Sequence, residues 1–364
     1  MKSVSIITVN FNQHQVNIDF LNSITANPSQ YKVEVIFVDN GSENEYESVY
    51  KEIFPDLIYV RSALNLGFAG GNNLGIKVAT SDYLLLLNND TEITPNMIDI
   101  MVDEMEQNLN IGILSPLILY FDEPTVIQYA GFTKMNYLTA RNSDIGNLDI
   151  DQGQYKFDSR ETAYCHGAAM MCRRATLEKV GLMAENYFLY YEELDWCEQF
   201  LKAGLKVWFT GKAKIYHKES MSVGKESAIK TYFMTRNRML FIRRNTGYLN
   251  TFFFSLYYVG IACTKQIISY VVKGKIKLSR RFKVALGILS GASLILFAVL
   301  IYLSIQLEPI VASRLRETIN TATNGLYRIS FSEIHLNPFT GSVKFDDIVF
   351  TPNDSIHQEL KGQN

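Results

Sequence analysis

Residues 83–93 read YLLLLNNDTEI, and this stretch decides the predicted fold. Tyr83–Leu87 is an uninterrupted apolar run of strand length, and the polar cluster Asn88-Asn89-Asp90 follows it directly. A short apolar run bounded by turn-forming residues is typical of a strand buried on both faces. The stretch therefore predicts a core strand with polar side chains at its carboxyl end.

The same pattern occurs upstream of this strand. Further strand-like runs lie at Val4–Val9, Val33–Val38 and Leu57–Val60. Segments of helical length lie at His14–Ala26, Glu43–Phe54, Ala69–Ala79 and Pro95–Gln107. This alternation predicts an α/β fold with a mixed, mostly parallel sheet and helices on both faces. Ligands bind such sheets beyond the carboxyl ends of the strands, and the polar residues at 8–10, 39–42 and 88–90 are expected there.

Composition narrows the class of protein. The chain has 364 residues, 47% of them apolar, which is enough for one large domain or two modest ones. The net charge of −2 gives no reason to expect nucleic-acid binding. The four cysteines form no CxxC pair and are expected to be free thiols in a reducing compartment. No secretory signal pattern opens the chain.

Two apolar segments, Thr251–Val272 and Val284–Ile305, follow a loop-rich stretch at 121–162 and a second ordered block at Ala163–Ser220. Val284–Ile305 has no charged residue, and as a helix of about 33 Å it is long enough to cross a bilayer core of about 30 Å. Thr251–Val272 contains Lys265 in mid-segment, which is costly at the bilayer centre, so we expect an interfacial helix there.

Between the two segments, Lys273–Lys283 has six basic residues and no acidic one. Basic loops favour the cytoplasmic side of a membrane. The sequence therefore predicts residues 1–245 as a cytoplasmic catalytic domain and 246–283 as a membrane-associated segment with a basic linker. Residues 284–305 are predicted to be a single transmembrane helix of the inner membrane, and 306–364 an extracytoplasmic tail.

Five runs in sequence order carry a family resemblance: VSIITVNFN (4–12), VIFVDNGSEN (35–44), NLGFAGGNNLGI (65–76), YLLLLNNDTEI (83–93) and YYEELDWCEQFLKAGLKV (190–207). Over about residues 1–245 the chain resembles the family 2 glycosyltransferases, in particular their rhamnosyltransferase-like branch, which has a GT-A fold. The resemblance implies an inverting hexosyltransferase. Its donor would be a dTDP- or UDP-sugar, with rhamnose as the sugar that the branch suggests, and its acceptor a polysaccharide or lipid-linked glycan.

The resemblance also implies a nucleotide-sugar site. Asp39 would accept a hydrogen bond from the pyrimidine base, whereas the alternative for Asp39-Asn40-Gly41 is a simple turn. The other residues expected in this site are Thr8, Asn10, Asn65, Gly67, Gly71, Asn73, Asn88 and Asn89. Arg236 is expected either to bind the diphosphate or to lie on a basic face against anionic lipid.

A metal site and a proton acceptor are implied as well. Asn88-Asn89-Asp90 matches the family's DXD position, so Asp90 is the expected ligand of Mg²⁺ or Mn²⁺, with His217 as a second candidate. Asn88 supplies no charge, and metal affinity without donor should be weak. Glu193 falls on the position of the catalytic base, with Glu192 and Asp195 expected to orient the site or cap a helix. The alternative for this acidic cluster is a solvated first helical turn. The small residues after His166 are expected to line the acceptor side.

Residues 282–351 resemble the start of AsmA-like envelope proteins, which continue outside the membrane as a long β-rich domain. The tail stops at Asn364, so we expect an incomplete domain without catalysis. An alternative function is a non-catalytic envelope protein whose degenerate sugar-nucleotide fold serves as a cytoplasmic anchor. A dehydrogenase is disfavoured, because no GxGxxG follows the first strand.

Overall fold

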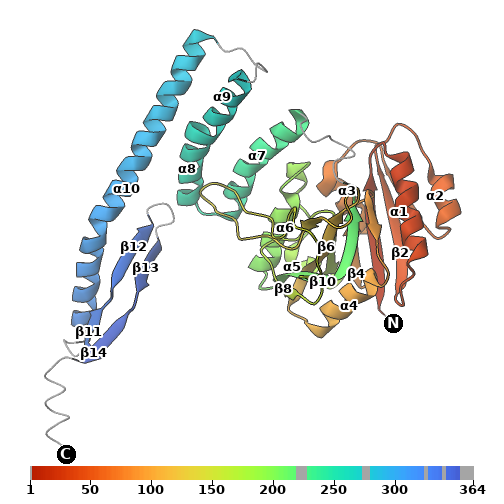
Figure 1. Ribbon diagram of the computed structural model, residues 1–364, viewed down its shortest axis with the longest axis horizontal. Coiled ribbons are helices and arrows are strands. Elements are labelled where there is room, and N and C mark those ends of the chain that lie inside the picture. Colours follow the sequence, from red (N-terminus) through yellow and green to blue (C-terminus); the bar gives the residue numbers. More distant parts are fainter. Residues whose placement is uncertain (1, 219–227, 273–278, 324–326, 338–341, 353–364) are drawn as a thin grey trace, which may run out of the picture. The chain divides into compact units, whose positions relative to one another are not determined.

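The computed structural model describes residues 2–218, 228–272, 279–323, 327–337 and 342–352. The chain divides into two compact units, one of Met1–Asn136 with Ala140–Asn245 and the other of Tyr137–Thr139 with Thr246–Asn364. Each unit is described by itself below, with its helices and strands labelled as in Figure 1.

The first unit alternates strands and helices over its first 120 residues. Its strands are β1 (Ser3–Asn10), β2 (Lys32–Asn40), β3 (Ile58–Ser62), β4 (Tyr83–Leu87), β5 (Thr91–Ile93), β6 (Ile111–Tyr120), β7 (Ile127–Tyr129), β8 (Ser159–Glu161), β9 (Ala169–Arg173) and β10 (Lys206–His217). Its helices are α1 (His14–Ala26), α2 (Glu47–Ile53), α3 (Gly67–Val78), α4 (Met97–Gln107), α5 (Leu177–Val180), α6 (Glu192–Lys202) and α7 (Ala228–Asn245). Short 3₁₀ turns cover Arg174–Thr176 and Glu185–Tyr187.

These described strands form one sheet in the order β3-β2-β1-β4-β9-β6-β10-β5, with β7 paired to β6 and β8 to β10. β1 runs parallel to β2 and β4, β2 to β3, and β6 to β10. β9 lies antiparallel between β4 and β6, and the short strands β5, β7 and β8 also pair antiparallel. The mixed α/β fold class with a mostly parallel central sheet is confirmed.

The direction of β9 decides what reaches the carboxyl edge of the sheet. Because β9 runs against β4 and β6, it begins at the edge where β1, β2, β4, β6 and β10 end. His166 and its neighbours precede β9, and His217 ends β10. Segments that are far apart in the chain therefore meet beside Asn88-Asn89-Asp90.

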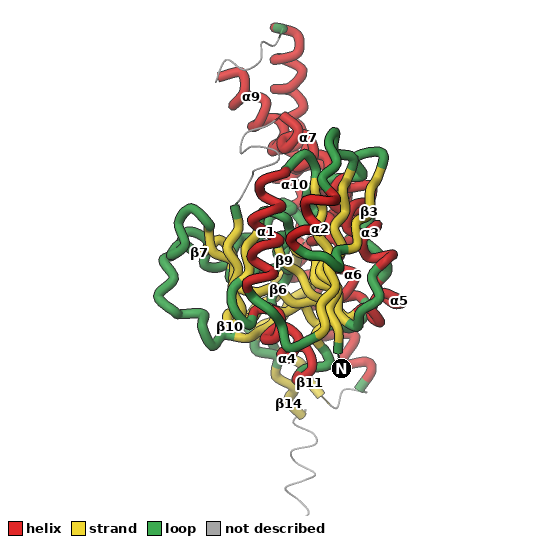
Figure 2. Tube along the Cα trace, turned by 90° about the vertical axis from the view of Figure 1, so that its right-hand side faces the viewer, coloured by secondary structure: helices red, strands yellow, loops and turns green. Residues whose placement is uncertain are grey.

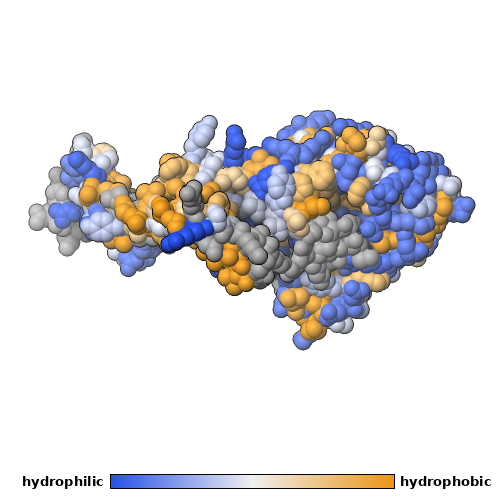
Figure 3. Space-filling model, turned by 90° about the horizontal axis from the view of Figure 1, so that it is seen from above, coloured by the Kyte–Doolittle hydropathy of each residue, from blue (hydrophilic) through white to orange (hydrophobic). Residues whose placement is uncertain are grey.

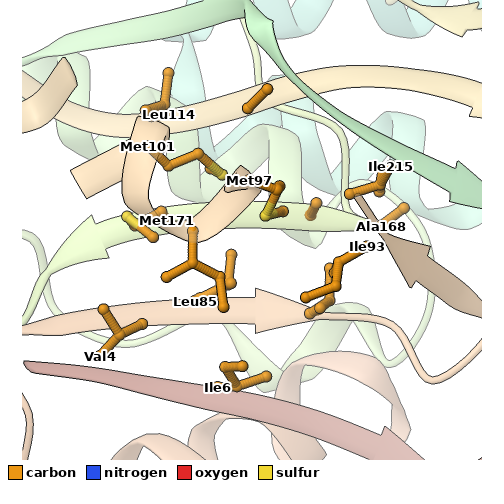
Figure 4. Packing of buried hydrophobic residues seen from close by; sticks show 14 of the residues in the cluster. Val4, Ile6, Leu85, Ile93, Met97, Met101, Leu114, Ala168, Met171 and Ile215 are labelled. Atoms are coloured by element: carbon orange, nitrogen blue, oxygen red, sulfur yellow. The ribbon is translucent and has the colours of Figure 1, made fainter. Parts of the chain in front are cut away.

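Helices cover both faces of the sheet (Figures 1 and 2). On one face, Val4, Ile6 and Leu85 of the strands share a buried core with Met97 and Met101 of α4, as Figure 4 shows. On the other face α3 approaches the strands closely at its glycines. A Cβ added to Gly75 would lie 2.4 Å from the Ile7 side chain, and one added to Gly71 would lie 2.6 Å from Val9. The sheet is thus buried on both faces, as its apolar strands require.

The second unit is helical, with two short β-ribbons. Helix α8 (Tyr248–Tyr257), a π-helical turn (Tyr258–Cys263) and α9 (Thr264–Val272) form one helical segment, and α10 covers Arg280–Ala322. Gly260 in the π turn packs against Ser293 of α10, since an added Cβ would lie 2.1 Å from the serine hydroxyl oxygen. β11 (Tyr327–Ser330) pairs with β14 (Val349–Pro352), and β12 (Glu333–Asn337) with β13 (Ser342–Asp346).

Hydrophobic side chains are exposed along the helices of this unit, where orange atoms mark them in Figure 3. Among the described residues, Tyr248–Val272 is the one helical segment long and apolar enough to cross a membrane, and Val284–Leu296 is a shorter apolar stretch. The candidate span thus falls on the segment that we expected to be interfacial. Side chains at several positions of 297–305 are not described, and residues 273–278 of the basic linker lie outside the described ranges. The single-span topology and the AsmA-like tail remain predictions.

Candidate active site

A pocket of about 380 Å³ opens at the carboxyl edge of the sheet in the first unit. It brings together many of the predicted site residues. Those that line it are Asn65, Gly67, Asn88, Asn89, Asp90, His166, Glu192, Glu193 and His217. These residues come from five separate segments of the chain, at 65–67, 88–90, 166, 192–193 and 217. The strand order and directions described above bring these segments together.

Asp90 and His217 face each other inside the pocket. His217 Nε2 lies 3.2 Å from Asp90 Oδ1, and both side chains are largely buried. Asp90 Oδ1 is buried without a hydrogen-bond donor. His217 Nδ1 lies 2.8 Å from Gln128 Oε1. An amide oxygen only accepts, so this contact assigns the imidazole proton to Nδ1.

With its proton on Nδ1, His217 directs the lone pair of Nε2 towards a carboxylate oxygen. Two acceptors at 3.2 Å leave a place for a proton or a cation. A carboxylate and an imidazole whose other nitrogen is held by a carbonyl are a common donor set for a divalent cation. The residues present fit a metal ion here.

Another group of potential ligands lies in the second unit. Glu333, His335 and Asp346 offer ligand atoms within 4.8 Å of one another on the β12–β13 ribbon, at exposed or half-exposed positions. Lys344 Nζ lies 2.8 Å from Asp346 Oδ1 and already neutralises this carboxylate. The group was not foreseen in the sequence, and exposed acidic groups of this kind need no metal.

Two glutamates begin α6 at the pocket wall. Glu193 is half-buried, and burial raises its pKa to about 7 although backbone hydrogen bonds at the helix start lower it. Glu192 is 2% exposed, and burial together with the charge of Glu193 holds its pKa well above its ordinary value. Its Oε2 has no hydrogen-bond partner. Glu193 is the group in this pair that titrates near neutral pH, as a general base requires.

Asp195, one helical turn further on, lies outside the pocket. Its carboxylate accepts hydrogen bonds from the Tyr187 hydroxyl (3.0 Å), Arg244 Nε (3.0 Å) and Asn245 Nδ2 (2.7 Å). It is 1% exposed. Asp195 therefore joins α6 to α7, and its expected role in orienting the site stays a prediction.

Asp39 is buried at the end of β2 and does not line the pocket. Its oxygens accept hydrogen bonds from Ser42 N and from the Tyr59 hydroxyl, each at 3.0 Å, and Arg61 Nε lies 3.4 Å away. The next residue, Asn40, does line the pocket, and it binds Asn65, Leu66 and Gly67.

Four more predicted nucleotide-site residues lie behind the pocket wall. The Asn73 amide bonds Met183 and Glu185, and Gly71 packs on β1. Asn10 bonds Ser42 and Gln13. The Thr8 hydroxyl is buried without a hydrogen-bond partner.

Arg236 does not line the pocket either, although its charge acts on the pKa of Glu192 in the pocket wall. Its Nη2 donates to the carbonyls of Asn186 (2.7 Å) and Tyr187 (2.5 Å), and its Nε donates to Asn237 Oδ1 (2.9 Å). These contacts use three of the five N–H groups of the guanidinium that was expected to hold a diphosphate. Lys230 lines the pocket instead, near the start of α7, as the one lysine or arginine among its described lining residues.

Sequence reasoning missed several further residues of the pocket. They are Lys230, Gln128 and the aromatic residues Phe11, Phe68, Phe132, Phe188 and Tyr190. Phe11, Phe68 and Tyr190 lie inside motif runs quoted above, and Phe188 closely precedes the last of these runs. Lys230, Gln128 and Phe132 carried no such signal. His166, which was expected on the acceptor side, accepts the Ala168 N–H at Nδ1, and burial lowers its pKa to about 3. It is therefore a neutral imidazole with its proton on Nε2.

Comparison with known proteins gives a consistent picture. Residues 5–181 match the model of the family described as Glycosyl transferase family 2. The match includes Asp90 and His166 and ends before Glu193 and His217.

Three relatives are similar over more than half of this chain. The low-salt glycan biosynthesis hexosyltransferase Agl10 of Haloferax volcanii is 26% identical over 250 residues, 66% of this chain and 75% of the relative. The N-acetylglucosaminyl-diphospho-decaprenol L-rhamnosyltransferase of Mycobacterium tuberculosis is 23% identical, over 57% of this chain and 74% of the relative. The dTDP-rhamnosyl transferase RfbF of Shigella flexneri is 22% identical, over 62% and 76%.

Proposed function

We propose, from the match of residues 5–181 to the model of Glycosyl transferase family 2, that the pocket transfers a hexose with inversion. The donor in this proposal is a dTDP- or UDP-sugar, with dTDP-rhamnose first, and the acceptor is a hydroxyl of a polysaccharide or lipid-linked glycan. The names of the rhamnosyltransferase relatives support this choice of donor and acceptor. The observation that carries the reaction type is Glu193, a half-buried carboxylate with a pKa of about 7 in the same pocket as Asp90 and His217.

The proposed step moves one proton and one glycosyl group. The acceptor hydroxyl oxygen attacks the anomeric carbon while Glu193 takes the hydroxyl proton. The bond from the anomeric carbon to the diphosphate oxygen breaks on the opposite face, and the nucleoside diphosphate leaves with the electron pair. Attack and departure on opposite faces invert the configuration. A carboxylate with a pKa near the working pH serves this proton transfer better than an ordinary glutamate.

Asp90 and His217 are the residues that would hold a divalent cation. Their facing acceptor atoms and the orphaned carboxylate oxygen support this role. When bound, Mg²⁺ or Mn²⁺ would supply charge neutralisation for the departing diphosphate. Lys230 adds the positive charge that we first assigned to Arg236, since its side chain lines the pocket and that of Arg236 does not. Asn65 and Asn88 offer amide groups to the hydroxyls of the ribose or sugar.

The substitution Glu193→Gln tests this function. The glutamine keeps the shape of the side chain and cannot take a proton, so turnover should fall by about 10²–10⁴-fold. Donor binding, followed by thermal shift with dTDP-, UDP- and GDP-sugars, should be retained. Near-wild-type turnover in this variant would reject Glu193 as the base. Absence of any stabilisation by the three classes of donor would reject the sugar-nucleotide proposal itself, and the non-catalytic anchor would then be the better interpretation.

A further inference from the structure

The loop that precedes Glu192 has an unusual backbone. Phe188, Tyr190 and Tyr191 have φ values of 66°, 69° and 77°, in the left-handed region that non-glycine residues rarely adopt. A residue in this conformation persists only where surrounding contacts hold it. Phe188, Leu189 and Tyr190 line the pocket, and the next helix begins at Glu192. The conformation of this loop therefore sets where Glu193 lies.

A buried asparagine of α7 holds the loop from one side. Asn237 is 0% exposed. Its Nδ2 lies 3.1 Å from the carbonyl oxygen of Tyr187, 2.7 Å from that of Leu189 and 2.7 Å from that of Tyr190. One side-chain amide thus contacts three carbonyl oxygens of the loop between residues 187 and 190. The neighbouring Arg236 orients this amide, because its Nε donates to Asn237 Oδ1.

Arg236 and Asn237 together form a clamp on this loop. The Arg236 side of the clamp contacts the 3₁₀ turn that precedes the loop. Its Nη2 binds the carbonyls of Asn186 and Tyr187. Its guanidinium lies 4.8 Å above the ring of Phe233, and that ring stacks on Phe188 at a centroid distance of 5.0 Å. These contacts hold the arginine against the loop and the turn before it.

The start of α3 holds the loop from the other side. Phe68 N donates to the carbonyl of Phe188 at 2.7 Å. A Cβ on Gly67 would lie 2.2 Å from this carbonyl oxygen, so only glycine permits the approach. The loop joins the segment expected to contact the nucleotide-sugar to the helix that carries the proposed base.

We infer that Arg236 and Asn237 are positioning residues, which act on the reaction by holding residues 187–191 in the conformation that places Glu193 in the pocket. This role rests on the proposed function for its link to catalysis. Neither side chain lines the pocket, so neither is a ligand of the donor in this interpretation.

Hydrogen exchange of the full chain without substrate tests the clamp directly. Asn237→Asp is the main variant, because it keeps the side-chain volume and replaces the donor amide with an acceptor that repels the three carbonyls. Amide exchange of peptides covering residues 186–191 should become faster in Asn237→Asp and in Arg236→Ala. Arg236→Lys should restore part of the protection. The matched control is Arg243→Ala, an exposed residue of the same helix, and it should exchange as wild type.

Steady-state kinetics of the same variants test the consequence. A misplaced base should lower kcat by about 10²-fold, with a smaller change in donor KM. Wild-type exchange and wild-type kcat in Asn237→Asp would overturn the inference. If Asn237→Asp does not fold, the pair Arg236→Ala and Arg236→Lys decides by the same readouts. Faster exchange with unchanged kcat would reject the positioning role. The contacts of Arg236 and Asn237 would then stabilise the loop without affecting the reaction. Full activity in Glu193→Gln would reject the proposed base, and the exchange experiment would still report on the clamp.

Discussion

Glu192 and Glu193 are neighbours in the chain and differ in what their surroundings permit. Burial acts on both, but Glu192 is almost wholly enclosed, has an oxygen without a partner and faces the charge of Glu193. Glu192 therefore holds its proton to a higher pH than an ordinary glutamate does. Of the two, Glu193 is the group whose pKa of about 7 suits proton transfer near neutral pH.

The pH profile of the wild-type protein should show this difference. Because the base must be deprotonated, kcat/KM should fall as pH drops through about 7, by about tenfold per pH unit below it. A glutamate with the ordinary pKa of about 4.3 would keep full activity at pH 6. Glu192→Gln is the control and should keep the same profile, since burial already disfavours the charged form of that side chain. A rate that stays constant between pH 5 and 8 would contradict the assignment of the base.

A second prediction at the residue scale concerns Asp90 and His217, the proposed ligands of the divalent cation. Asp90→Ala should abolish the part of donor binding that depends on Mg²⁺ or Mn²⁺, because it removes the one carboxylate that faces His217. Gln128→Ala should weaken the metal-dependent part about 10–100-fold, since it releases the imidazole from its orienting carbonyl. Titration calorimetry with and without metal measures both. The exposed Asp122 supplies the control variant Asp122→Ala. Equal donor affinity with and without metal in the wild type would argue against a metal site.

At the scale of elements, α6 and α7 are joined by Asp195. Its carboxylate binds Arg244 and Asn245 of α7 and the Tyr187 hydroxyl before the loop. Burial and the charge of Asp195 raise the pKa of Tyr187, which stays a hydrogen-bond donor at every working pH. Of the acidic residues in this motif, Glu192 and Glu193 thus line the pocket, whereas Asp195 makes the contact between α6 and α7.

Asp195→Ala should therefore act on stability first. Removing the carboxylate leaves four donor atoms of three residues without this acceptor, and the free energy of unfolding should fall by about 1–3 kcal/mol. Denaturant unfolding measures this change. Glu161→Ala breaks an ion pair in which both side chains are largely exposed, and it should change the stability by less than about 1 kcal/mol. At permissive temperature Asp195→Ala should keep more activity than Glu193→Gln. Equal loss of activity without loss of stability would place Asp195 in the chemistry instead.

At the scale of the whole molecule, the second unit predicts that the protein associates with a membrane. Its helices expose many large apolar side chains, and Tyr248–Val272 meets the length and composition of a span. The topology predicted from the sequence has residues 1–283 in the cytoplasm, a span at 284–305 and the tail outside. The basic linker supports this orientation, because lysine and arginine are retained on the cytoplasmic side.

Cysteine labelling from outside intact cells tests this topology. In a chain with its own cysteines replaced, a cysteine added at Asn364 should react with an impermeant reagent, and one near Met1 should not. Truncation before Val284 should leave the protein partly membrane-bound, through the apolar and aromatic surface of Tyr248–Val272. Shielding of both ends would contradict the single span. Either Tyr248–Val272 would then also cross, or Val284–Ile305 would not.

The sequence by itself determined the repeating architecture of the first 107 residues. Apolar runs at Val4–Val9, Val33–Val38 and Tyr83–Leu87 became β1, β2 and β4, because a strand buried on both faces must be apolar throughout. The polar residues after these runs indicated the edge where the pocket lies. Asn88, Asp90 and Glu193 were predicted as site residues from the sequence, since each belongs to a local motif, and all three line the pocket.

Only the tertiary structure decided which of these residues share a pocket. Asp39 and Asp195 were predicted from local motifs, and their carboxylates are bound by partners elsewhere in the chain. Lys230 and Gln128 joined the pocket without any local signal. Asn237 lies 47 to 50 residues from the carbonyls it binds. Periodicity and turn chemistry are local properties of a chain, whereas hydrogen-bond partners and pocket walls depend on strand order and on the antiparallel β9, which the sequence pattern does not specify.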